Sequence, residues 1–118
     1  MAKVLIAEAD TKSRELLHKL LENWGHDVVP TCDGAEALGK TDSESFDLIV
    51  SDWMMPNLTG LELCETLKKR KSNIPFIMIG AKRTEEDINQ AYRSGITHFV
   101  AKPFKQDALQ ARITNALL

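Results

Sequence analysis

The chain has 118 residues, 43% of them hydrophobic and 27% charged, and a formal net charge of −2 at pH 7. This composition is typical of one compact domain with a single core. We expect no nucleic-acid surface because no lysine-rich run is present, and no membrane span because every apolar run is short. The N-terminal residues lack the apolar stretch of a signal peptide, so we expect a cytoplasmic protein.

Short apolar runs alternate with longer amphipathic segments. The runs are rich in β-branched residues and have the length of strands. They cover residues 3–7, 27–31, 46–51, 75–80 and 97–101. Several are almost continuously apolar, which is typical of strands that are buried on both faces.

The segments between these runs have helical patterns. The first carries apolar residues at helical spacing and ends at Gly25; they are Leu17, Leu20, Leu21 and Trp24. Three further helices begin with capping pairs, which are Asp33 with Glu36, Thr59 with Glu62, and Thr84 with Asp87. The last helix carries Leu109, Ile113, Ala116 and Leu117.

The order of elements predicts an α/β fold with five strand–helix units, (βα)5. Such alternation favours a parallel sheet with right-handed crossovers and helices on both faces. Five strands are too few for an eight-stranded barrel. We therefore predict an open, doubly wound, flavodoxin-like sheet with strand order 2-1-3-4-5, which binds ligands beyond the carboxyl ends of its strands.

Three acids and one lysine should meet at that edge. Glu8 and Asp10 follow the first strand, Asp52 follows the third, and Lys102 follows the fifth. Clustered acids repel unless a cation lies among them, and Mg²⁺ commonly uses one or two carboxylates with water. An aspartate beside Mg²⁺ and a lysine is equipped to accept a phosphoryl group. Taken singly, Asp10 is also a candidate helix cap and Asp52 a turn residue.

At this point the chain resembles the receiver domain of response regulators, the phosphoacceptor module of two-component signalling. The resemblance covers essentially all 118 residues. It rests on VLIAEAD (4–10), DLIVSDWMMPNLTGLEL (47–63), PFIMIGAK (75–82) and GITHFVAKPF (95–104). The second of these is the most specific. The resemblance implies a single receiver domain over residues 1–118, with no effector domain in this chain.

The resemblance also implies roles for individual residues. Asp52 is the expected phosphoacceptor, and Lys102 is expected to pair first with the acids and later with the phosphoryl group. Magnesium is expected on Glu8, Asp10, Asp52 and the backbone carbonyl of Met54. Phe99 is expected at the aromatic switch position, and the Lys102–Pro103 bond is expected to be cis.

Two positions depart from the family pattern. Ala9 stands where a second acid usually supplies a metal ligand, so we expect weak Mg²⁺ binding. Gly80 stands where a serine or threonine hydroxyl usually contacts the phosphoryl group. Since a differential contact is missing, phosphorylation should couple weakly to Phe99.

These observations leave three hypotheses. The first is a receiver phosphorylated on Asp52 by a histidine kinase or phosphotransfer partner. The second is a pseudo-receiver that binds proteins without phosphorylation. The third is a small flavodoxin-like or hydrolase enzyme, which a phosphate-binding helix start at residues 10–15 would suit. We favour a signalling domain over an enzyme, with output to a partner or a second copy through the fourth helix, fifth strand and fifth helix.

Overall fold

Strands and helices alternate along the chain in the computed structural model, which describes residues 2–81 and 83–118. The strands are β1 (Lys3–Ala7), β2 (Asp27–Thr31), β3 (Leu48–Asp52), β4 (Phe76–Gly80) and β5 (His98–Ala101). The helices are α1 (Thr11–Asn23), α2 (Gly34–Ser43), α3 (Gly60–Lys69), α4 (Glu85–Arg93) and α5 (Gln106–Ala116). Within these residues no helix is long and apolar enough to cross a lipid bilayer.

The strands form one parallel sheet in the order β2-β1-β3-β4-β5, which confirms the predicted topology. The predicted strand bounds differ most at β3, which begins at Leu48 rather than at residue 46 and includes Asp52. Pairing decides these bounds, because Asp52 still faces Ile79 in the ladder with β4. The acceptor candidate is therefore the last residue of a buried strand and is held by the sheet itself.

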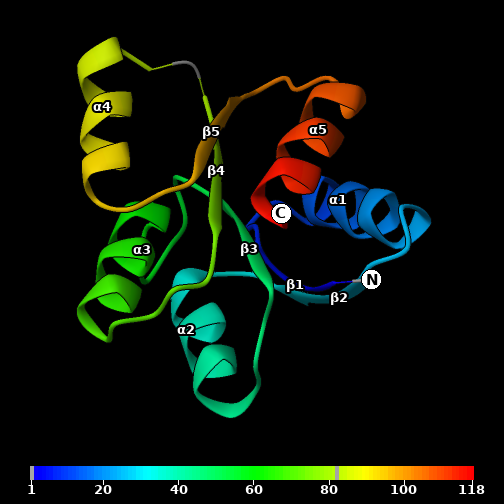
Figure 1. Cartoon of the computed structure of the whole chain (residues 1–118), viewed down its shortest axis with the longest axis horizontal. Coiled ribbons are helices and arrows are strands. Elements are labelled where there is room, and N and C mark those ends of the chain that lie inside the picture. The colour runs from blue at the N-terminus through cyan, green and yellow to red at the C-terminus, as the bar shows by residue number, and fades with distance from the viewer. Residues whose placement is uncertain (1, 82) are drawn as a thin grey trace.

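Helices cover both faces of the sheet (Figure 1). α1 and α5 lie on one face, and α2, α3 and α4 lie on the other. Because side chains alternate along a strand, Val4 and Ile6 pack with α1 and α5, whereas Leu5 and Ala7 pack toward the other helices. This double burial explains the continuous apolar runs in the sequence.

Caps fix the starts of four helices and therefore the ends of the strands before them. The capping residues, each accepting a backbone N–H bond from the first turn of its helix, are Asp10, Asp33, Thr59 and Thr84. Gly25 and Gly95 follow α1 and α4 with φ values of 92° and 112°, which glycine tolerates at no steric cost.

Candidate functional site

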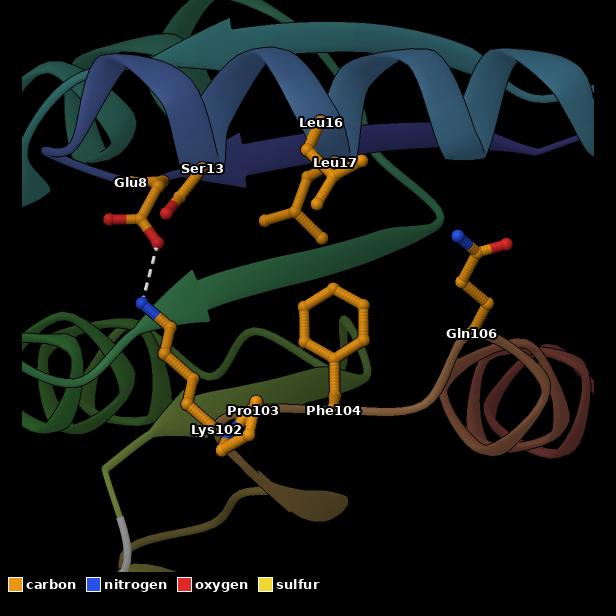
Figure 2. A pocket seen from close by; sticks show the side chains of 8 residues that line it. All are labelled: Glu8, Ser13, Leu16, Leu17, Lys102, Pro103, Phe104 and Gln106. Atoms are coloured by element: carbon orange, nitrogen blue, oxygen red, sulfur yellow. Dashed lines mark hydrogen bonds and ion pairs between the residues drawn. The ribbon is translucent and has the colours of Figure 1, made fainter.

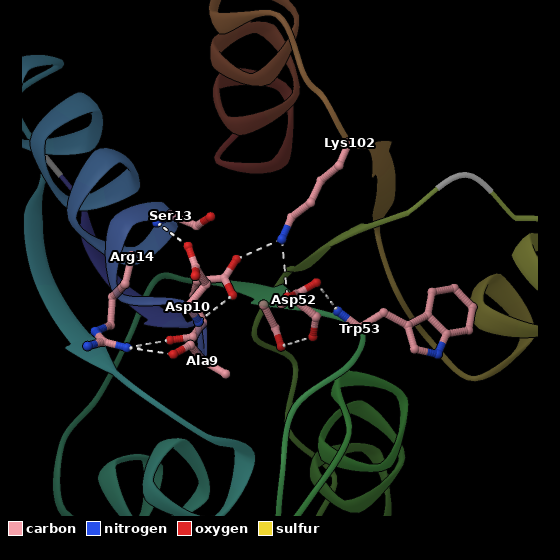
Figure 3. A network of polar contacts seen from close by, with 9 residues as sticks. Ala9, Asp10, Ser13, Arg14, Asp52, Trp53 and Lys102 are labelled. Atoms are coloured by element: carbon pink, nitrogen blue, oxygen red, sulfur yellow. Dashed lines mark hydrogen bonds and ion pairs between the residues drawn. The ribbon is translucent and has the colours of Figure 1, made fainter.

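Three charged side chains meet at the carboxyl edge of the sheet (Figures 2 and 3). Lys102 Nζ lies 2.8 Å from Glu8 Oε1 and 3.1 Å from Asp52 Oδ2. Glu8 directly follows β1, Asp52 ends β3, and Lys102 directly follows β5. The strand order thus brings together residues that are up to 94 positions apart. We call these three residues the acid side of the site.

Burial and charge act against each other on the acid side. Glu8 is almost fully buried, at 1% exposure, and burial raises the pKa of its carboxyl while the bond from Lys102 opposes that rise. For Lys102, burial alone would lower the pKa, but the bonds to Glu8 and Asp52 outweigh burial, and its pKa is raised. The charged ammonium therefore holds close together two carboxylates that would otherwise repel.

The peptide bond between Lys102 and Pro103 is cis, as the resemblance implied. The Lys102 backbone N–H donates to the carbonyl oxygen of Gly80 at 2.7 Å. The lysine therefore begins from the edge of β4, and its side chain extends back across β3 toward β1 (Figure 3).

Asp10 does not join the acid side. Its carboxylate caps α1 by accepting the Ser13 N–H at 2.9 Å, and this bond lowers the pKa of its exposed carboxyl. Its own N–H donates to Glu8 Oε2 at 3.1 Å. Arg14 stabilises the same turn, because its guanidinium donates to the carbonyl oxygens of Glu8 (2.9 Å) and Ala9 (3.2 Å) (Figure 3). The capping interpretation of Asp10 is therefore the one that the structure supports.

The oxygen donors on the acid side fit a hard divalent cation. Glu8 and Asp52 each direct one carboxylate oxygen at the Lys102 ammonium, which shows that both can face one cation, and magnesium typically takes one or two carboxylates and completes its shell with water. Met54, two residues after Asp52, is 62% exposed at the same edge. Within residues 2–81 and 83–118, no group of three or more His, Cys, Asp or Glu side chains is placed to hold a metal.

A different set of residues flanks Asp52 toward β5, and we call Trp53, Gly80, Arg83 and Phe99 the aromatic side. The Trp53 N–H donates to Asp52 Oδ1 at 2.8 Å and to the Ile79 carbonyl at 2.9 Å. A Cβ atom at Gly80 would lie 3.1 Å from Trp53 Cβ and 3.7 Å from Phe99 Cε1. The Cβ atom of Trp53 is therefore the closest obstacle to a side chain at position 80, and the rings of Trp53 and Phe99 lie at van der Waals distance.

Aromatic contacts link this side to the edge strand β5. The Trp53 and Phe99 rings meet edge to face, with centroids 6.0 Å apart and an interplanar angle of 77°. Arg83 lies on the connection between β4 and α4, and its guanidinium carbon is 4.2 Å from the centroid of the Trp53 ring. The Phe99 N–H donates to the hydroxyl of Tyr92 on α4 at 3.1 Å. Trp53 is thus in contact with Asp52 at the end of β3 and with Phe99 on β5.

A groove of about 420 Å³ opens beside the acid side, between α1 and the connection from β5 to α5 (Figure 2). Apolar side chains form much of its wall, and Leu16 within it is 49% exposed. The lining residues are Glu8, Ser13, Leu16, Leu17, Lys102, Pro103, Phe104 and Gln106. A molecule seated there would lie next to Lys102.

Comparison with known proteins identifies the family. The family model for the response regulator receiver domain matches residues 4–114. The chain belongs to this family. Receiver domains are signalling modules of two-component systems and interact with histidine kinases or phosphotransfer partners.

The relatives of this receiver domain agree with that assignment. It is 37% identical to the alkaline phosphatase synthesis transcriptional regulatory protein PhoP of Bacillus subtilis over 94% of this chain and 46% of that protein. The Francisella response regulator 1452 receiver domain superposes with a TM-score of 0.95 at 34% identity, covering 99% of this chain and 97% of that one. The chain thus spans about half the length of the curated relatives it matches.

A more distant structure shows the fold alone. The receiver domain of sensor histidine kinase PA1611 from Pseudomonas aeruginosa PAO1, described with a magnesium ion coordinated in its active-site cleft, is 22% identical. It covers 98% of this chain and 97% of its own, with a TM-score of 0.89. The five-stranded flavodoxin-like architecture is therefore shared across this range of identity.

The structure brings together Glu8, Asp52 and Lys102 as the sequence predicted. It places Gly80 and Phe99 on the opposite flank of Asp52. Sequence reasoning missed Arg14 and Arg83, although both follow predicted strands of the site by only a few residues. Arg14 contacts backbone carbonyls of a turn, and Arg83 contacts the face of an indole. Neither contact pairs opposite charges, so no charge pattern in the sequence predicts it.

Proposed function

We propose that this receiver domain accepts a phosphoryl group on Asp52 from a histidine kinase or phosphotransfer protein. The observation that carries this proposal is the position of Lys102, 3.1 Å from Asp52 and 2.8 Å from Glu8. A carboxylate oxygen of Asp52 would attack phosphorus, and the bond from phosphorus to the donor's histidine nitrogen would break, leaving its electron pair on the imidazole. Lys102 would neutralise charge that develops on the phosphoryl oxygens.

Magnesium is the metal we propose for this site, as receiver domains generally bind it there. Glu8, Asp52 and the backbone carbonyl of Met54 would hold the ion. The chemistry supplied by the bound ion would be positive charge that neutralises the charge on the phosphoryl oxygens. We expect weak affinity because Ala9 carries no carboxylate and Asp10 caps α1 instead. The magnesium described for the Pseudomonas receiver domain is consistent with this choice.

We propose that the donor approaches over the groove beside α1 and that output leaves through the face of α4, β5 and α5. The groove offers apolar contact next to Lys102. On the output face, Tyr92 is 44% exposed and already bonds the backbone of Phe99. A partner protein or a second copy could therefore sense Phe99 there. We expect this domain to work in the cytoplasm and to contact neither nucleic acid nor membrane.

Labelling by a small phosphodonor tests the proposal. The wild-type chain incubated with acetyl phosphate and Mg²⁺ should gain the mass of one phosphoryl group, and Asp52→Asn should not. Asp47→Asn is a matched variant, because Asp47 is exposed at the opposite end of the same strand. It should be labelled like the wild type. Equal labelling of Asp52→Asn and wild type would show that the acceptor is another residue.

The pseudo-receiver remains a second proposal, favoured because the Ala9 side chain supplies no metal ligand and Gly80 has no side chain to supply a hydroxyl. In that case the wild-type chain would gain no phosphoryl mass at any phosphodonor concentration. Binding of an output partner would also be the same for wild type and Asp52→Asn. The two proposals therefore give opposite results in one labelling experiment.

A further inference from the structure

The side chain of Arg83 lies against the indole of Trp53. Its guanidinium carbon lies 4.2 Å from the centroid of the Trp53 ring. Its Nε atom is buried and has no hydrogen-bond partner among the described residues. A buried donor without a partner is costly, so this geometry favours a state of the protein in which Arg83 gains an acceptor.

Trp53, the neighbour on which Arg83 stacks, directly follows Asp52 in the chain. Its backbone N–H bonds both the carboxylate of Asp52 and the carbonyl of Ile79, so the indole starts at the junction of β3 and β4. The guanidinium that stacks on this indole therefore lies against the residue next to Asp52, and both Arg83 and Trp53 follow strands that end at the same edge of the sheet. An arginine offers five N–H donors in a planar fork, which suits the oxygens of a phosphoryl group.

The residue at position 80 cannot donate a side-chain hydrogen bond to a phosphoryl group. Gly80 carries no side-chain donor, and a Cβ atom there would already lie 3.1 Å from Trp53 Cβ. A hydroxyl-bearing residue would therefore crowd Trp53 at its Cβ atom. The same tryptophan that limits position 80 holds the guanidinium of Arg83 in place. The two features have a single structural origin.

We propose that Arg83 is a phosphoryl-binding residue of this receiver domain. It rests on Trp53 while Asp52 is unmodified, and it donates to a phosphoryl oxygen once Asp52 carries the group. This inference depends on the proposed function of Asp52. A phosphoryl group brings a charge of about −1.5 to −2, and a charge-assisted hydrogen bond to it would replace the contact with the ring.

The test uses beryllofluoride with Mg²⁺ as a phosphoryl mimic, titrated into the chain and followed by amide NMR. Arg83→Met keeps an unbranched side chain over Trp53 but removes every donor, and it should weaken beryllofluoride binding about 10- to 100-fold. Arg83→Lys keeps the charge without the fork and should lie between Arg83→Met and wild type. Arg93→Met removes an exposed arginine at the end of α4 and should bind like wild type.

Magnesium alone, titrated into the same variants, separates binding from structural damage. Arg83→Met should bind Mg²⁺ as wild type does. Beryllofluoride affinity within about twofold of wild type, or equal losses for Mg²⁺ and beryllofluoride, would overturn the role of Arg83. If wild type itself failed to bind beryllofluoride, both this role and phosphorylation of Asp52 would be wrong. If all Arg83 variants bound beryllofluoride as wild type does, only the role of Arg83 would be wrong, and the proposal for Asp52 would be unaffected.

Discussion

The acid side and the aromatic side lie on opposite flanks of Asp52, and different forces hold them together. On the acid side, Lys102 bridges two carboxylates within 3.1 Å. On the aromatic side, Trp53 packs edge to face on Phe99 and beneath Arg83. One flank therefore depends on charge and protonation, and the other depends on shape.

The two sides therefore differ in how easily their side chains can be replaced. The proposed phosphoryl transfer to Asp52 needs specific charges at specific points, and on the acid side Lys102 supplies one of them. The aromatic side lacks a hydroxyl at Gly80 but fills the space with Trp53. Packing can be rebuilt with other side chains if the volume is kept, whereas a charge needed for transfer has few substitutes.

The largest loss of stability should come from a steric clash at Asp52 that changes no charge. A Cβ at Gly60 would overlap the carbonyl oxygen of Asp52 and lie 2.7 Å from Met78 Sδ. Gly60→Ala should therefore push α3 from the end of β3 and cost about 3 kcal/mol in urea unfolding. Gly39→Ala adds the same methyl where nothing lies within 4 Å and should gain about 0.5–1 kcal/mol. Equal stabilities would reject the close approach.

Removing the charge at the centre of the acid side should have the next largest effect. Lys102→Ala leaves Glu8 buried without its ammonium, so the pKa of Glu8 should rise further. Breaking a fully buried pair costs about 3–5 kcal/mol; because the Lys102 side chain is 31% exposed, we expect about 2 kcal/mol at pH 7.

The pH dependence of that loss has a defined sign. A glutamate whose folded pKa exceeds its unfolded pKa contributes stability below the unfolded value, and loses it as pH rises through the folded pKa. The deficit of Lys102→Ala against wild type should therefore shrink between pH 7 and pH 5. Lys105→Ala, at an exposed position nearby, should show no such trend. A deficit independent of pH would mean that Glu8 does not feel Lys102.

Adding a carboxylate should strengthen metal binding on the acid side. Ala9→Asp should tighten Mg²⁺ binding about 10-fold, because the metal gains an oxygen ligand near Glu8 and Asp52. Without metal the variant should be less stable, because a further negative charge joins the site. Thermal melts with and without Mg²⁺ measure both effects. Equal Mg²⁺ affinity in the two proteins would show that position 9 does not face the metal.

The smallest effect should appear on the aromatic side. Gly80→Ala brings a methyl to 3.1 Å from Trp53 Cβ and should cost about 1 kcal/mol. In a Trp53→Gly background the same substitution should cost less, because the Cβ atom at position 53 that it approaches is absent. A double-mutant cycle measured by urea unfolding gives the coupling. An identical cost in both backgrounds would remove Trp53 as the reason for the crowding at position 80.

The convergence of Glu8, Asp52 and Lys102 could be predicted because parallel strands end at one edge and alternation fixes their order. Whether Asp10 faces the metal or caps α1 could not be predicted, since both interactions use the same carboxylate and only the turn geometry decides. Arg83 was missed because its stacking on Trp53 joins a loop to a strand about 30 residues away. Such contacts depend on side-chain rotamers that no periodicity in the sequence reports.

The most direct test of the division between the two sides is an amide NMR map with and without beryllofluoride and Mg²⁺, in wild type and in Trp53→Leu. In wild type, the largest shifts should occur at Asp52, Trp53 and Lys102, with a smaller shift at Phe99. In Trp53→Leu, the acid side should respond as before while the shift at Phe99 disappears. A Phe99 shift that is unchanged in Trp53→Leu, or an acid side that no longer responds, would contradict the account.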